Sequence, residues 1–194
     1  MVETKKKKTI VVGIPGVGKT TVVEKTNEIL NKKGIKSTVA VFGTLMFEHA
    51  KKIGITNRDE IRKLSMYDQQ KLQEQTVDEL SNLDGDVIMV DTHLFVRTKS
   101  GYYPGLPHSL LEKLRPDSLI LIIADAIDIA ARRGKDRTRS RDSITIEEIN
   151  QDLNFSISMI STISVLTGAP FALVRNAPEK SLQAALDMVQ FIEK

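Results

Sequence analysis

Short, uninterrupted runs of apolar residues alternate along the chain with longer segments in which apolar residues recur every three or four positions. The runs indicate buried strands at 9–12, 36–42, 87–90, 118–124 and 171–174. The periodic segments indicate helices at 20–33, 44–52, 67–83, 145–168 and from 178 onward, with shorter helices beginning at 57 and 126. Strands that are apolar along their whole length are covered on both faces. The pattern therefore predicts a single α/β domain over residues 1–194, a five-stranded parallel sheet between two helical layers.

The helix that begins at Thr145 and the last helix are each expected to bury one apolar face. Thr145 and Glu148 stand at capping-box spacing and begin the helix that Gly168 ends. Its inward residues are expected to be Ile146, Ile149, Leu153, Ile157 and Ile160. The last helix is expected to begin at Pro178 and to bury Leu182, Leu186 and Val189. The segment 92–107 contains several turn-forming residues and is predicted to be irregular: Gly101, Pro104, Gly105 and Pro107.

Composition narrows the class of protein. A hydrophobic fraction of 41% and a charged fraction of 27% are typical of a soluble globular protein, and the absence of cysteine excludes disulfides and thiolate metal sites. The longest apolar run, 119–124, is far shorter than the roughly 20 residues of a membrane-spanning helix. We expect a cytoplasmic protein with no membrane partner. The net charge of +3 reflects a basic run at 5–8 and an arginine-rich segment at 132–142, and we expect no nucleic-acid partner.

The first predicted strand leads directly into a glycine-rich sequence, residues 13–20, that fits G-x-x-x-x-G-K-[ST] at every fixed position. Its position between a strand and a helix is the one that a phosphate-binding P-loop requires. Glycines let backbone N–H groups turn toward phosphate oxygens, and the helix N-terminus adds unpaired donors. We expect Lys19 to contact the β- and γ-phosphates and the Thr20 hydroxyl to bind Mg²⁺. The ATP-binding residues are predicted to be Gly13, Ile14, Pro15, Gly16, Val17, Gly18, Lys19, Thr20 and Thr21.

A second metal-binding residue is expected at the end of another strand. The run 87–90 ends at Asp91, whose carboxylate would hold Mg²⁺. Asp125 follows the next apolar run, but the helix after it gives this residue a structural role as a cap. The fold class is therefore that of the P-loop NTPases, with a three-layer α/β/α architecture.

Six basic residues fall between 132 and 142. We predict that this segment is a short lid that closes over ATP, in which Arg132, Arg139 and Arg141 reach phosphates and act with Lys19 in catalysis. A solvated surface loop is the alternative.

With these features in place, the chain resembles the adenylate kinases, and among them the archaeal type. The resemblance covers nearly the whole sequence and is carried by residues 13–21, 42–48, 58–64, 91–93, 97–107 and 138–142. It implies transfer of a phosphoryl group from ATP to AMP, giving two ADP, with Mg²⁺. It also implies assembly into a homotrimer.

The resemblance further implies an AMP-binding segment at about 42–83. The candidate AMP-binding residues are Thr44, Arg58, Arg62 and Arg97. Bacterial relatives carry an arginine shortly after the threonine, where this chain has Phe47 and Glu48, so the charge for the AMP phosphate must come from elsewhere. Arg58 and Arg62 are four residues apart and share one helix face, which is either an AMP site or an ordinary surface.

Some alternatives stay open. Tyr102 and Tyr103 could line the AMP base pocket or pack within a loop, and His93 could bond the nucleotide or cap a strand. The acceptor could be another nucleoside monophosphate, and a nucleic-acid-associated P-loop ATPase is a more distant alternative. A GTPase is disfavoured because no Asn-Lys-x-Asp sequence occurs.

Overall fold

The computed structural model describes residues 6–98, 101–135 and 145–194. Five parallel strands form one sheet in the order β2-β3-β1-β6-β7. Their bounds are β1 Lys7–Val12, β2 Ser37–Val41, β3 Val87–Asp91, β6 Ser118–Ile123 and β7 Phe171–Arg175. Every residue of β3 is buried, as are the first five residues of β6, because helices cover both faces of these central strands. The predicted five-stranded parallel sheet is confirmed.

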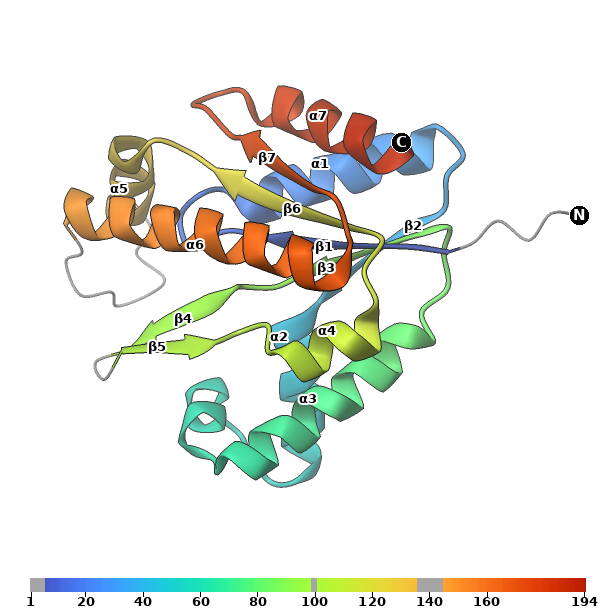
Figure 1. The fold of residues 1–194 in the computed structure, drawn as a ribbon, viewed down its shortest axis with the longest axis vertical. Helices are drawn as coiled ribbons and strands as arrows, with labels where there is room; N and C mark the ends of the chain where they lie inside the picture. The colour runs from blue at the N-terminus through green and yellow to red at the C-terminus, as the bar shows by residue number, and fades with distance from the viewer. Residues whose placement is uncertain (1–5, 99–100, 136–144) are drawn as a thin grey trace, which may run out of the picture.

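Helices lie on both sides of this sheet. Figure 1 shows α1 (Lys19–Lys32) and α7 (Ser181–Glu193) together on one side, while α6 (Ile146–Thr167) runs along the other. The remaining helices are α2 (Phe42–Lys52), η1 (Arg58–Lys63), α3 (Met66–Ser81), α4 (His108–Leu114) and α5 (Ala126–Lys135). In the part of the chain that is described, no helix is long and apolar enough to cross a membrane.

The prediction of an irregular segment at 92–107 is wrong. Phe95–Thr98 (β4) and Gly101–Pro104 (β5) pair as an antiparallel hairpin, and α4 follows. Aromatic and β-branched residues favour pairing here, whereas the prediction gave more weight to the glycines and prolines. Pro104 is tolerated because each strand of a two-stranded ribbon is an edge strand.

The buried faces of two helices also differ from the prediction. In α6, Ile146 and Ile157 are 47% and 36% exposed, while Asp152 and Ser156 are buried. Their burial reflects polar contacts that the hydrophobic pattern could not reveal. In α7, Leu182 and Leu186 are exposed, and the buried face consists of Ala184, Ala185, Met188, Val189 and Ile192. Helix α7 packs on α1, and two of the residues on its buried face are small alanines.

Other elements differ from the prediction in their bounds or in helix type. The last helix begins at Ser181 rather than at Pro178, and the segment after Asn57 is a 3₁₀-helix. Helix α5 continues to Lys135, so the first residues of the predicted lid are helical. The rest of the lid, residues 136–144, lies outside the described residues.

Candidate functional site

The glycine-rich loop lies between β1 and α1, as predicted. Gly16 and Gly18 have φ angles of 86° and 85°, the left-handed region that glycine adopts without strain. Ile14 and Val17 are buried and fix the loop to the core. In the described structure no side chain caps the N-terminus of α1, and its first turn carries no acidic residue. Its backbone N–H groups and positive dipole end therefore form a site suited to an anion.

Lys19 and Asp91 meet at the carboxyl edge of the sheet. Asp91 ends β3 and lies opposite Val11 of the neighbouring strand β1. Its carboxylate forms an ion pair with the Lys19 ammonium, and both residues are buried, with exposed fractions of 6% and 9%. Burial lowers the pKa of Lys19 from 10.5 to about 7, because removal from water disfavours the charged form. The structure thus brings a lysine and a carboxylate together beside the loop.

The oxygen donors near the loop fit Mg²⁺. Thr20 lies exposed in the first turn of α1, and Asp91 ends the strand next to β1. No group of three or more His, Cys, Asp or Glu side chains that could hold a metal occurs among the described residues. Mg²⁺ commonly takes one or two protein oxygens and completes its shell with water and substrate phosphates, so a hydroxyl with a carboxylate suits it. Thr21, also exposed, adjoins Thr20.

A second helix N-terminus without a side-chain cap lies at the start of α2, which follows β2 directly. Thr44 is exposed in the first turn of α2, whose N-terminal residue makes no side-chain cap. The Arg58 guanidinium lies against Gly43, where an added methyl group would be 3.2 Å from Arg58 Cζ. Two of the predicted AMP-binding residues are therefore brought together. The side chain of Arg62 lies outside the described residues.

Arg97 is held elsewhere, by carboxylates of α6. It contacts Asp152 at 2.7 Å and Glu148 at 2.9 Å, and Tyr102 donates a hydrogen bond to Asp152 at 2.9 Å. The hydrogen bond that Arg97 donates to Asp152 is the main reason why the pKa of Arg97 is raised. Burial, followed by the Asp152 bond, raises the pKa of Tyr102. Hydrogen bonds from Thr145 lower the pKa of Glu148, and the capping box predicted for these two residues is confirmed. The structure does not group Arg97 with Thr44 and Arg58, and its role toward AMP stays a prediction.

Tyr102 packs against other aromatic rings, whereas Tyr103 and Asp125 lie at the surface. Tyr102 packs edge-to-face with Phe95 and Phe155 at centroid distances of 5.0 and 5.4 Å, while Tyr103 is 48% exposed. Asp125 forms an exposed ion pair with Arg175 at 2.6 Å, and its carbonyl accepts the first backbone hydrogen bond of α5.

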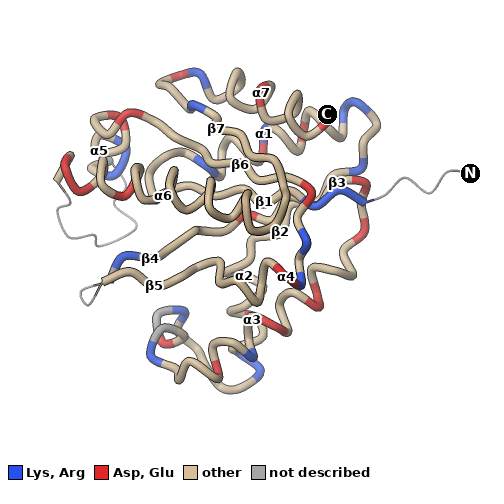
Figure 2. The backbone as a smooth tube through the Cα atoms, viewed as in Figure 1, with Lys and Arg blue, Asp and Glu red and all other residues tan. Residues whose placement is uncertain are grey.

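The basic end of α5 lies on the glycine-rich loop. Arg132 donates to the carbonyl oxygens of Val17 at 2.9 Å and Asn176 at 3.0 Å, and Arg133 donates to Pro15 at 2.8 Å. Arg132 thus lies beside the predicted phosphate site, whereas Arg139 and Arg141 lie outside the described residues. Figure 2 shows basic segments at the end of α5 and on β4, with acidic segments near them at α5 and α6.

Sequence reasoning missed Asn176 and Asp152. Asn176 directly follows β7. Asp91 was predicted as a site residue because it stands at the end of a strand, and the same reasoning could have found Asn176. Asp152 carried only a weak signal, since it lies one helical turn after Glu148.

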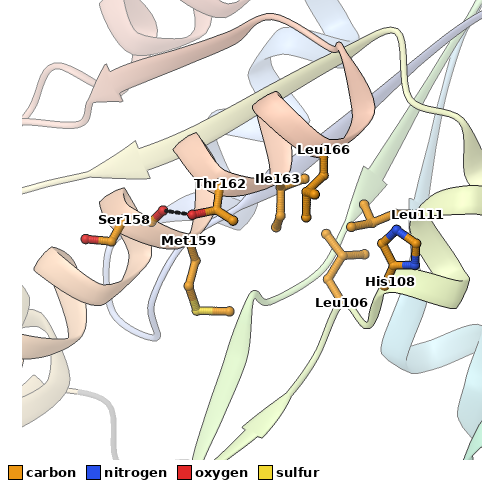
Figure 3. Close-up of a pocket in the computed structure, with 8 residues that line it drawn as sticks. All are labelled: Leu106, His108, Leu111, Ser158, Met159, Thr162, Ile163 and Leu166. Atoms are coloured by element: carbon orange, nitrogen blue, oxygen red, sulfur yellow. Dashed lines mark hydrogen bonds between the residues drawn. The ribbon is translucent and has the colours of Figure 1, made fainter.

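One apolar pocket lies away from these residues. It has a volume of about 270 Å³ and lies between α4 and α6, with Leu106, Leu111, Met159 and Ile163 among its lining residues (Figure 3). It contains none of the predicted site residues.

The loop, the buried lysine and the strand-end aspartate, on a parallel sheet with helices on both faces, define a P-loop nucleotide-binding protein. A family model described as AAA domain matches residues 12–150. The chain is 38% identical to adenylate kinase from Methanocaldococcus jannaschii, across 96% of this chain and 100% of that protein. It is 40% identical to adenylate kinase from Saccharolobus islandicus, across 93% and 96% of the two chains. The chain belongs to the adenylate kinase family.

Solved structures agree on the fold. Shikimate kinase from Acinetobacter baumannii, in complex with shikimate, superposes with a TM-score of 0.62 at 15% identity, covering 98% of this chain and 94% of that one. Shikimate kinase from Bacteroides thetaiotaomicron gives a TM-score of 0.59 at 11% identity, covering 97% and 99%. At such identities the likeness shows a shared P-loop kinase fold.

Proposed function

We propose that this protein catalyses the reversible transfer of a phosphoryl group from ATP to AMP, giving two ADP, with Mg²⁺. The observation that carries the proposal is the placement of two uncapped helix N-termini at one edge of the sheet. Helix α1 follows β1 and α2 follows β2, with Asp91 on β3 between them. A triphosphate at α1 and a monophosphate at α2 would have their reacting groups on the same side of the molecule.

The chemistry needs charge and alignment rather than a general base. The AMP phosphate is already an anion, so its oxygen can attack once the two nucleotides are held in line. Lys19 would contact the β- and γ-phosphates from the start of α1. Thr44, Arg58 and Arg62 would hold the AMP phosphate, and Arg97 is proposed as a further AMP ligand.

Thr20 and Asp91 would hold Mg²⁺. When bound, the ion would neutralise part of the phosphate charge.

We propose that residues 132–142 close over ATP and exclude water, with Arg132, Arg139 and Arg141 contacting phosphates. The hydrogen bonds that Arg132 donates to the Val17 and Asn176 carbonyl oxygens use two of its five N–H donors. We also propose a cytoplasmic location. Assembly into a homotrimer, implied by the resemblance to archaeal adenylate kinases, belongs to the same proposal.

A coupled assay of ADP formation tests the activity. ATP with Mg²⁺ is combined with AMP, CMP, UMP or GMP, or with no acceptor, and a Lys19→Met variant controls for contaminating kinases. We expect rapid ADP formation with AMP alone among the acceptors and little ATP hydrolysis without one. A preference for CMP or UMP would assign a different monophosphate kinase. ADP formation that needs no acceptor would replace the proposal with an ATPase.

Sedimentation equilibrium tests the assembly separately. A homotrimer predicts three times the mass of one chain over a range of protein concentrations. A single-chain mass would reject the trimer and leave the activity unaffected.

A further inference from the structure

Carbonyl oxygens of the glycine-rich loop have partners outside the loop. Val17 O accepts a hydrogen bond from Arg132 Nη1 and another from Asn176 Nδ2, each at 2.9 Å. Pro15 O accepts one from Arg133 Nε at 2.8 Å. The donors come from α5 and from the residue after β7, which are far from the loop in sequence. Loop residues 15 and 17 are therefore held by contacts that no local sequence motif contains.

Holding a carbonyl also orients the next backbone N–H. In a planar trans peptide the C=O of one residue and the N–H of the following residue point in opposite directions. The bonds to Pro15 O and Val17 O therefore turn the N–H groups of Gly16 and Gly18 away from α5 and Asn176. These are amides of the phosphate-binding sequence, and their direction decides whether they can donate to a phosphate oxygen.

The glycines fit tightly against the same partners. A methyl group added at Gly16 would lie 2.8 Å from Arg133 Cγ, and one added at Gly18 would meet the Asn176 amide, with Asn176 Cγ at 3.6 Å. The side chains of Asn176 and Arg133 thus pack directly on the loop backbone.

Asn176 is itself firmly placed. It is 4% exposed, its backbone N–H donates to Ile123 O at 2.8 Å, and its carbonyl accepts from Arg132 Nη2 at 3.0 Å. It joins the end of the sheet, the loop and α5. These backbone bonds fix the position of Asn176, and its side-chain Nδ2 donates to Val17 O.

We infer that Asn176 and Arg133 are positioning residues for ATP binding, because they hold the Val17 and Pro15 carbonyls outward and so direct the Gly18 and Gly16 amides toward phosphate. Neither residue acts by touching the transferred phosphoryl group. Their effect falls on the ATP half of the reaction and not on AMP. The inference depends on nucleotide binding by the loop and holds whichever monophosphate is the acceptor.

Substitutions that remove the donor groups test this role. Asn176→Asp places a carboxylate oxygen where an amide donates, and Arg133→Met keeps an unbranched stem against Gly16 without a donor. We expect each to raise KM for ATP by about tenfold, as for the loss of one hydrogen bond, with KM for AMP unchanged within about twofold. Arg175→Ala is the matched control, since Arg175 directly precedes Asn176 and its side chain pairs with Asp125 at the surface. It should leave both constants unchanged.

Backbone NMR gives a readout that does not depend on turnover. In ligand-free protein, the ¹H–¹⁵N resonances of Gly16 and Gly18 should shift in Arg133→Met and Asn176→Asp respectively. Those of Gly34 and Gly168, which end α1 and α6, should stay in place. Circular dichroism establishes that each variant is folded, and Arg133→Met keeps the test available if Asn176→Asp unfolds. The inference is overturned if KM for ATP and AMP rise by the same factor, or if the loop glycine resonances do not move. Absence of ATP binding by the wild-type protein would instead refute the proposed function.

Discussion

Lys19 combines a buried ammonium group with a single opposing carboxylate. Loss of water lowers the pKa of Lys19 to about 7, and Asp91 supplies the nearest negative charge. A bound triphosphate brings several negative charges against the same ammonium and favours its protonated form. Nucleotide binding should therefore raise the pKa of Lys19 and be linked to the uptake of a proton.

This linkage has a definite sign. At about pH 8 the free protein has Lys19 mostly neutral and the complex has it protonated, so binding should take up close to one proton per chain. At about pH 6 Lys19 is already protonated and the uptake should vanish. Calorimetry of ATP binding in two buffers with different ionisation enthalpies measures the proton count. Proton release at pH 8, or an uptake that persists in Lys19→Met, would contradict the prediction.

Asp91 and Asp125 offer a direct comparison of two strand-end aspartates. Asp91 is buried beside Lys19, whereas the carboxylate of Asp125 is 59% exposed and pairs with Arg175. If Asp91 holds Mg²⁺, Asp91→Asn should raise the Mg²⁺ concentration for half-maximal activity by about 10- to 100-fold. Asp125→Asn should leave it unchanged. Titrating Mg²⁺ at fixed ATP measures both, and equal Mg²⁺ requirements in the two variants would remove Asp91 from the metal site.

The β4–β5 hairpin is an element that depends on its contacts with α6. An isolated two-stranded hairpin is at best marginally stable. Here Arg97 is bonded to Asp152 and Glu148, while Phe95 and Tyr102 pack against Phe155 of α6. Helix α6 therefore supplies much of the stability of the hairpin.

Removing the charge of Asp152 should loosen this attachment. Its side chain is 5% exposed and that of Arg97 is 26% exposed, so the pair is only partly screened by water. We expect Asp152→Asn to lower the free energy of unfolding by about 1–3 kcal/mol, below the range for a fully buried pair. Asp125→Asn, in an exposed pair, should cost at most about 1 kcal/mol. Denaturant unfolding of both variants checks the difference, and equal losses would show that Asp152 is not an anchor.

Prediction from sequence succeeded where the determining residues are neighbours in the chain. The glycine-rich loop, the capping box at Thr145 and Glu148, and the apolar strands are all local patterns. The contacts of Arg97 with Asp152 and of Asn176 with Val17 join residues 55 and 159 positions apart. Nothing in a local pattern specifies such pairs. The same limit explains the misplaced face of α7, which packs on α1 with Ala184 and Ala185 buried while larger leucines stay exposed.

The whole molecule places the N-termini of α1 and α2 at one edge of one sheet. In the proposed arrangement, ATP would lie against β1, α1, α5 and β7, and AMP against β2, α2 and η1. Only a shared strand, β3, lies between β1 and β2. Because the two halves use different elements, a change in one should affect binding of one nucleotide and spare the other.

Arg58 tests this division, because it lies against Gly43 at the start of α2 and away from the loop before α1. Arg58→Ala removes a charge that we expect to face the AMP phosphate. KM for AMP should rise by about tenfold or more, as for loss of one charge-assisted hydrogen bond, while KM for ATP stays within about twofold. Lys63→Ala is the matched control, since it removes an equal charge from the same exposed 3₁₀-helix. Its effect on KM for AMP should be small. If Lys63→Ala raises KM for AMP as much as Arg58→Ala does, the general positive potential of η1 attracts AMP. If Arg58→Ala raises KM for AMP and KM for ATP by the same factor, the two halves are not separate and the AMP site must lie elsewhere.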